Sequence, residues 1–381
     1  MMKWVRGELD RRRTAPGPHR RTVVLIDGLA ALRDEYQDYE GLQLLDGLYR
    51  AYADGPEVGL WFAAATTRAK AIPSAMEEVT TQKWLFKLAD PYDYSASGIR
   101  PAEAPAGVPG RCILAETHLQ THVATPGAGL AAAISQVCER WGNPVAKPGV
   151  VGQLPELATV AQLGVAAQLG AEPWHIPVGI RESDLGVGFL ELYEGEHVLV
   201  AGPVRSGKST TLLALAEVLR AGAVADGRPL QLWGIANRRS PLATADALLD
   251  RIAVGVEDVP AMMAAARMQT GRVVILIDDA EKVDDSDQSI IGLLGANLPH
   301  VHVIAAGRSD DLRTLYSHWT KVLRKARCGI LLRPDPDYDA ELLGAPVPRK
   351  PPVALAPGRG YQCVGGQATF VQCASPTGPV A

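Results

Sequence analysis

Short apolar runs that end at an acidic residue recur along this chain. One is Val23–Ile26, followed by Asp27, and another is Val273–Ile277, followed by Asp278. Continuous runs of this kind, rich in branched residues, are typical of strands buried on both faces of a parallel sheet. Their alternation with helix-like stretches predicts an α/β fold with a mainly parallel sheet. Further predicted strands are 58–68, 84–89, 176–180, 197–202, 230–236, 301–308 and 328–335.

Several segments of the first half return in the second half in the same order. VVLIDGLA returns as VILIDDAE, WFAAATTR as VIAAGR, and PGR occurs at 109–111 and 357–359. HLQTHVA matches TFVQCA with Gln120 aligned to Gln372, and the offsets of all matches lie between 240 and 252 residues. Ordered matches at nearly one spacing predict an internal duplication.

The two copies differ in how much chain precedes their acidic strands. The second has roughly 100 residues upstream, whereas the first has only about 20. We therefore expect a partial module at 1–126, a connecting helix and linker at 127–173, and a complete module at 174–381. The sequence also predicts that the chain is the C-terminal part of a longer tandem protein.

A phosphate-binding motif lies in the second copy, ahead of its acidic strand. GPVRSGKS matches the pattern GxxxxGK followed by Ser or Thr, and it lies between a strand-like run and a helix-like stretch. Such glycines let backbone N–H groups face phosphates, and the helix N-terminus adds a favourable dipole. We expect Lys208 to reach the β/γ-phosphates, and Ser209 and Asp278 to hold Mg²⁺, which predicts ATP and Mg²⁺ as cofactors. The predicted nucleotide-binding residues are Gly202, Pro203, Val204, Arg205, Ser206, Gly207, Lys208, Ser209 and Thr210.

These motifs resemble the FtsK/SpoIIIE family. The segments that carry the resemblance are GPVRSGKST, VVILIDD, AAGR and the terminal PGRG…VQ. More narrowly, the chain resembles the tandem ATPase modules of EccC-type motors in type VII secretion, and FtsK-domain proteins that carry FHA domains. The resemblance implies a RecA-like P-loop NTPase fold, a ring or stacked assembly with other ATPase modules, and ATP-driven movement of a polymer.

The resemblance also implies two catalytic residues. Asp279 stands where the family usually has a water-activating glutamate, and Arg308, like Arg68 in the first copy, matches the arginine of the family's TQRP segment. Gly307 replaces the glutamine of that segment, and Gly28 replaces the acid in the first copy. These departures predict slow hydrolysis in the second copy and none in the first.

Two classes of function stay open on the sequence alone. One is a motor ATPase, and the other is an ATP-holding regulatory or scaffolding module that hydrolyses little. A net charge of −4, without a basic and aromatic stripe, favours a protein substrate and leaves a DNA translocase as the alternative. The clusters Arg11–Arg13 and Arg324–Arg327 are interpreted as solvated helix faces.

The remaining expectations concern location and partners. The sequence has no stretch of about 18 apolar residues, so it predicts no membrane segment. The five cysteines form no CxxC pair, which favours a reducing compartment. We expect a cytoplasmic location, with contact to the inner face of the membrane through a parent complex. The expected partners are other ATPase modules of the same or a parent protein, including further copies of this chain.

Overall fold

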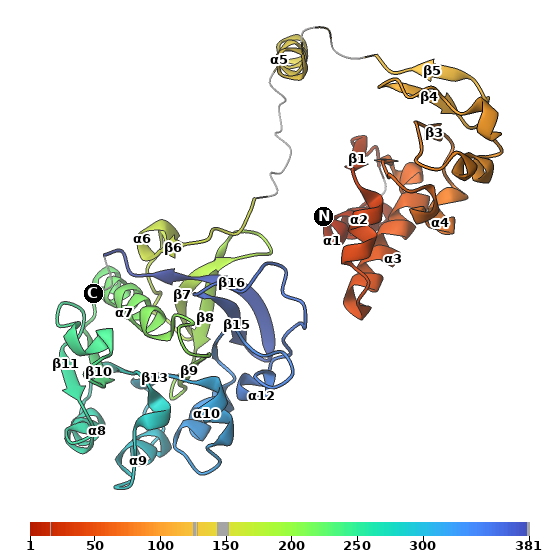
Figure 1. Cartoon of the computed structure of the whole chain (residues 1–381). Coiled ribbons are helices and arrows are strands. Elements are labelled where there is room, and N and C mark those ends of the chain that lie inside the picture. Colours follow the sequence, from red (N-terminus) through yellow and green to blue (C-terminus); the bar gives the residue numbers. More distant parts are fainter. Residues whose placement is uncertain (16, 125–126, 128, 143–151, 379–381) are drawn as a thin grey trace. The chain divides into compact units, whose positions relative to one another are not determined.

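The structure is a computed structural model that describes residues 1–15, 17–124, 127, 129–142 and 152–378. The chain divides into two compact units, Met1–Lys147 and Pro148–Ala381 (Figure 1). This division falls inside the segment that the sequence predicts as a connection. From Leu154 onward the chain belongs to the second unit, where Val160 and Leu163 are buried in the core.

The second unit is built on one large sheet. Its strand order is β11-β10-β12-β13-β9-β14-β15-β16-β7-β8, and β6 pairs with β16. Neighbours from β11 to β14 are parallel, and those from β14 to β8 are antiparallel, so the predicted mainly parallel α/β sheet is confirmed. The strands are β6 (Ala158–Thr159), β7 (Trp174–Arg181), β8 (Val187–Leu192), β9 (Val198–Ala201), β10 (Leu230–Ala236), β11 (Arg251–Val254), β12 (Arg272–Ile277), β13 (Val301–Gly307), β14 (Gly329–Leu332), β15 (Arg359–Val364) and β16 (Gln367–Ser375).

Helices cover both faces of this sheet and give three layers. One apolar cluster joins α7 and α6 to one face, and a second cluster joins α8 to α12 to the other. The helices are α6 (Val160–Leu163), α7 (Lys208–Asp226), α8 (Val259–Arg267), α9 (Ser289–Gly295), α10 (Ser309–Thr314), α11 (Thr320–Leu323) and α12 (Ala340–Leu343). None of the helices in the described ranges is long and apolar enough to cross a membrane.

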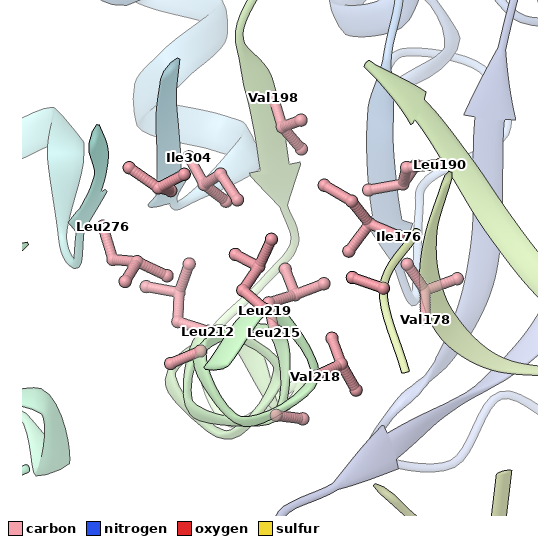
Figure 2. Close-up of a cluster of buried hydrophobic side chains, with 14 of the residues drawn as sticks. Ile176, Val178, Leu190, Val198, Leu212, Leu215, Val218, Leu219, Leu276 and Ile304 are labelled. Atoms are coloured by element: carbon pink, nitrogen blue, oxygen red, sulfur yellow. The ribbon is translucent and has the colours of Figure 1, made fainter. Parts of the chain in front are cut away.

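The long helix α7 packs at the centre of the first apolar cluster. Figure 2 shows its leucines directed at side chains from β9, β12, β13, β7 and β8. Gly207 and Gly227 bound the helix, both with a left-handed backbone that other residues adopt at a cost. On β12, Val274 and Leu276 face α7. The alternate residues Val273, Ile275 and Ile277 belong to the second cluster on the other face of the sheet. A strand buried on both faces requires the continuous apolar run seen in the sequence.

The first unit contains a small parallel sheet of β1 and β2, and an antiparallel sheet of β3, β4 and β5. Val24 and Ile26 of β1 pack with α1 and α3 in one apolar cluster. The elements are α1 (Met2–Thr14), β1 (Thr22–Ile26), α2 (Leu29–Glu35), α3 (Tyr39–Asp54), β2 (Leu60–Ala64), α4 (Ser74–Glu77), β3 (Trp84–Leu85), β4 (Arg111–Leu114), β5 (Gln120–His122) and α5 (Leu130–Trp141).

Two expectations for local structure are wrong. The strand predicted at 84–89 stops at Leu85, because the hydroxyl of Tyr94 takes the backbone bonds that a neighbouring strand would need. That hydroxyl donates to Phe86 O at 2.8 Å and accepts from Leu88 N at 2.7 Å. The arginine clusters are also not wholly solvated. Arg12 is 5% exposed and donates to Thr22, Val58 and Gly59, and Arg324 donates to Leu312 O.

The α7 core generates a stability prediction. Leu215 is 1% exposed within the α7 cluster, so Leu215→Ala should lower the unfolding free energy of the second unit by about 2–5 kcal/mol. Val224, on the same helix, is 78% exposed, and Val224→Ala should cost less than about 0.5 kcal/mol. Native-state hydrogen exchange of the β12 amides measures both variants. Equal effects would show that α7 does not pack as described.

Candidate functional site

The P-loop connects β9 to α7 near the middle of the large sheet. β9 lies between β13 and β14, and all four of its residues are buried. Gly202 has no room for a side chain, because a Cβ there would lie 2.6 Å from Leu332 O. Arg205 and Gly207 have φ angles of 58° and 103°, which curl the loop into the start of the helix. Within the loop, Ser206 is buried, whereas Val204 and Arg205 are exposed.

Lys208 lies folded back over this loop. Its Nζ donates to Gly202 O at 3.0 Å and to Pro203 O at 2.8 Å, and the residue is 8% exposed. Burial lowers the pKa of Lys208, while the nearby carboxylates, Glu281 foremost, act in the opposite direction. The ammonium group therefore lies at the concave side of the loop, where a phosphate would be neutralised.

Asp278 joins the P-loop helix to two strands. Its Oδ2 accepts hydrogen bonds from Ser209 Oγ at 2.7 Å and from Ser240 Oγ at 2.5 Å, and its Oδ1 accepts from Asp279 N at 3.1 Å. The residue is 3% exposed. A hydroxyl beside a carboxylate is a hard-oxygen donor set, which is the kind that Mg²⁺ prefers. Ser209 and Asp278 therefore fit the predicted metal.

Ser240 was not predicted from the sequence. It follows β10 and caps a short helical turn by accepting from Leu242 N. The only sequence signal is the polar segment NRRS directly after a strand. β10 and β12 are adjacent in the sheet, so this segment reaches Asp278 although 38 residues separate them.

Asp279 is held by two partners. Its Oδ2 accepts from Asn237 Nδ2 at 2.6 Å and from Lys282 Nζ at 2.8 Å, and its side chain is 25% exposed. The residue has a left-handed backbone with φ of 51°. Its negative charge is thus already paired with a cation beside the site.

Glu281 is a second residue that the sequence reasoning missed. Its side chain is 3% exposed, and its Oε2 accepts from Arg308 N at 3.1 Å. Its other oxygen lies 3.8 Å from Arg308 Nε and makes no hydrogen bond within the described part of the chain. Burial raises the pKa of this carboxyl group. The available signal was a third acid three residues after Asp278 in IDDAEK.

The predicted site residues thus converge from three adjacent strands. Lys208 and Ser209 follow β9, Asp278 and Asp279 follow β12, and Arg308 follows β13. Arg308 keeps 39% of its side chain exposed and precedes α10. Because these strands are parallel, their carboxyl ends meet at one edge, which is where ligands bind in open α/β sheets. Thr210 is half-buried in the first turn of α7.

The PGR segment at 357–359 is hydrogen-bonded to the backbone of the P-loop. Gly358 N donates to Ser206 O at 2.8 Å, and Cys373 N donates to Gly358 O at 2.8 Å. Arg359 Nε donates to Gln372 Oε1 at 3.1 Å, and the two residues are cross-strand partners. The paired PGR and VQ motifs therefore form a scaffold that holds the loop.

The first unit shows that one predicted correspondence is wrong. There the cross-strand partner of Arg111 is His122, not Gln120, which pairs with Ile113. Val123 N donates to Gly110 O at 2.8 Å, as Cys373 N does to Gly358 O. His122 is therefore the counterpart of Gln372. The sequence match is therefore offset by two residues along the strand. Residues two apart on a strand lie on the same face, so an offset of two leaves the alternating pattern of the sequence unchanged.

No protein-family model matches the chain. The chain is 25% identical over 380 residues to the ESX secretion system protein EccC of Thermomonospora curvata, covering 89% of this chain and 27% of that protein. It is 27% identical over 221 residues to the ESX-1 secretion system protein EccCb1 of Mycobacterium tuberculosis, covering 54% of this chain and 36% of that protein. The chain thus spans roughly a quarter to a third of these relatives.

Solved structures support the fold. EssC ATPases 2 and 3 from Geobacillus thermodenitrificans superpose with a TM-score of 0.67 at 17% identity, covering 98% of this chain and 78% of that one. EccC ATPases 2 and 3 from T. curvata, in complex with a signal sequence peptide, give a TM-score of 0.58 at 22% identity, covering 98% and 72%. The chain has the fold of a P-loop ATPase. Among such ATPases, its sequence is similar to the EccC proteins of type VII secretion, which confirms the predicted resemblance.

The scaffold under the P-loop generates a prediction. At Gly358, φ is 78° and an added Cβ would lie 2.8 Å from Gln372 Nε2. At Gly365, φ is 56° and nothing lies within 4 Å. Gly365→Ala should therefore cost only the backbone penalty of about 1 kcal/mol, and Gly358→Ala should cost about 1–2 kcal/mol more. Urea unfolding of both variants measures the difference in unfolding free energy. Equal losses of stability would show that Gly358 does not lie against the side chain of Gln372.

Proposed function

We propose that the second unit binds ATP with Mg²⁺ at the carboxyl edge of β9, β12 and β13. The observation that carries this proposal is the Ser209–Asp278 hydrogen bond beneath a P-loop whose lysine lies over the loop carbonyls. Lys208 would contact the β/γ-phosphates, and the backbone of Gly202–Thr210 would surround them. Ser209 and Asp278 would hold the metal, which supplies charge neutralisation to the phosphates.

We further propose that the chain serves as an ATPase module of an EccC-like protein-secretion motor. The curated relatives are secretion proteins, and one of the structural neighbours is bound to a signal sequence peptide. These relatives favour a protein substrate over the alternative of DNA translocation. In such a motor the chain would act in the cytoplasm beside other ATPase modules, with contact to the membrane through its partners.

Turnover at this site should be slow. Asp279 is the proposed water-activating carboxylate, but Lys282 and Asn237 already hold its Oδ2. An attacking water would have to compete with these two donors for the same oxygen, so the carboxylate is less available as a general base. Arg308 is the proposed partner for transition-state charge, and Glu281 holds its backbone. The pairing of Asp279 is the observation that supports the second candidate function, an ATP-holding regulatory module.

The binding proposal predicts the effect of removing Lys208. Lys208→Ala should weaken binding of a fluorescent ATP analogue roughly 100-fold, because two charge-assisted contacts are worth about 3 kcal/mol together. Lys321→Ala removes an exposed lysine on α11 and should leave the affinity unchanged. Fluorescence titration in the presence of Mg²⁺ measures both. Wild-type affinity in Lys208→Ala would rule out the P-loop as the binding site.

The catalytic proposal predicts a separate effect at Asp279. Asp279→Asn keeps the shape of the side chain and removes its charge, so the turnover number should fall roughly 100-fold while nucleotide affinity changes less than about twofold. Asp284→Asn makes the same change at an exposed acid and should alter neither quantity. A phosphate-release assay gives the rates. If wild type binds ATP without measurable release, the ATP-holding function replaces the motor function.

A further inference from the structure

One face of the small parallel sheet in the first unit is bare. Val23 and Leu25 of β1 are 60% and 74% exposed, and Trp61 of β2 is 49% exposed. These residues share a face, because Val23 pairs with Trp61 and Leu25 pairs with Ala63 in the register of the sheet. Large contiguous apolar surface is rare on a monomer and marks a site of contact.

The second unit shows what covers the corresponding face. Ile26 pairs with Ala64 just before Asp27, as Ile277 pairs with Ala305 just before Asp278. In this register the counterparts of Val23 and Leu25 are Val274 and Leu276, which are fully buried. They are buried by the leucines of α7, as Figure 2 shows for Leu276.

The opposite faces of the two sheets are covered alike. In the second unit, α8 precedes β12 and α9 follows it, and the two helices pack on each other. In the first unit, α1 precedes β1, α3 follows it, and these helices also pack on each other. The described part of the first unit therefore keeps one helical layer, and no helix there takes the place of α7.

The same unit contains an amphipathic helix whose apolar side faces solvent. In α5, Leu130, Ile134, Val137 and Trp141 are between 55% and 80% exposed, and none of the residues of this helix is buried. Their spacing of four, three and four residues puts them on one face. Twelve residues of helix extend about 18 Å, which matches the roughly 17 Å of a five-residue strand.

We infer that α5 docks on the bare face of β1 and β2 and takes the place that α7 has in the second unit. Val23, Leu25 and Trp61 would then lie under the stripe of Leu130, Ile134, Val137 and Trp141. Both surfaces are apolar and exposed. Within the described residues, the sheet face has no helix packed on it, and the apolar stripe of α5 has no sheet packed against it. Because both belong to one chain, α5 is present at a high effective concentration, which favours it over a separate partner.

Cross-linking tests the contact in the intact chain. Cys138 lies next to Val137 and is exposed, whereas the other four cysteines are buried. Leu25→Cys places a second thiol on the bare face, and a short bismaleimide should join it to Cys138 within one chain. Gln43→Cys places an exposed thiol on α3, which packs on the opposite side of the sheet, and should not react with Cys138.

Two outcomes of the cross-linking would overturn the inference. The first is equal cross-linking in the Leu25→Cys and Gln43→Cys variants, which would show that α5 has no preferred position. The second is a product that joins only separate chains, because it would assign the bare face to a second copy. Denaturing gels distinguish the products by mass.

Hydrogen exchange gives an independent readout. Val137→Asp places a charge in the apolar stripe and should speed exchange of the Thr22–Ile26 amides roughly tenfold, the factor expected for loss of one buried valine. Gln136→Asp makes a charge on the polar side of α5 and should leave exchange unchanged. The same exchange rates in both variants would contradict docking, whether or not the cross-link forms.

Discussion

The packing of α7 against β9, β12 and β13 is the constraint on which the second unit depends. It buries Val274, Leu276 and Ile304 under the leucines of one helix. The same packing fixes the N-terminus of that helix at the carboxyl edge of the sheet, so that Ser209 comes within 2.7 Å of Asp278. Core and site are therefore one structural unit, and a loosened α7 would displace the proposed metal ligands.

In its described residues, the first unit has two corresponding strands without such a helix in place. β1 and β2 keep the parallel register of β12 and β13, and Asp27 stands where Asp278 does. Gly28 and Ala30 occupy the positions of Asp279 and Glu281, so this unit has neither of the acids that follow Asp278. A face that a P-loop helix covers in one unit is free in the other, where we propose a contact with α5.

The features that could be predicted from the sequence are those defined by a short local pattern. The P-loop, the α/β alternation and the acid at the end of β12 are each contained in fewer than about 20 consecutive residues, so one segment suffices to identify them. Ser240 and Asn237 could not be identified in this way, because they reach Asp278 and Asp279 only through the pairing of β10 with β12. A short motif carries no information on such long-range pairing.

The burial of individual charged side chains could not be predicted from the sequence. Arg12 looked like part of a solvated cluster, but it closes a buried set of contacts with Thr22, Val58 and Gly59. Glu281 looked like one acid among several, but it is buried against Arg308. The match of Gln120 to Gln372 failed for a related reason, because strand register is set by backbone pairing and not by residue identity.

Hydrogen exchange of the intact chain with and without Mg²⁺ and ATP would show whether the nucleotide binds at the P-loop of the second unit and leaves the first unit unchanged. A ligand that binds only the native state stabilises it by about 2.7 kcal/mol at 100 times its dissociation constant. We expect slower exchange at Gly202–Ser209 and at the residues that follow β12, with no change at Thr22–Ile26. Unchanged exchange at the P-loop, or equal protection of both units, would contradict nucleotide binding at this site.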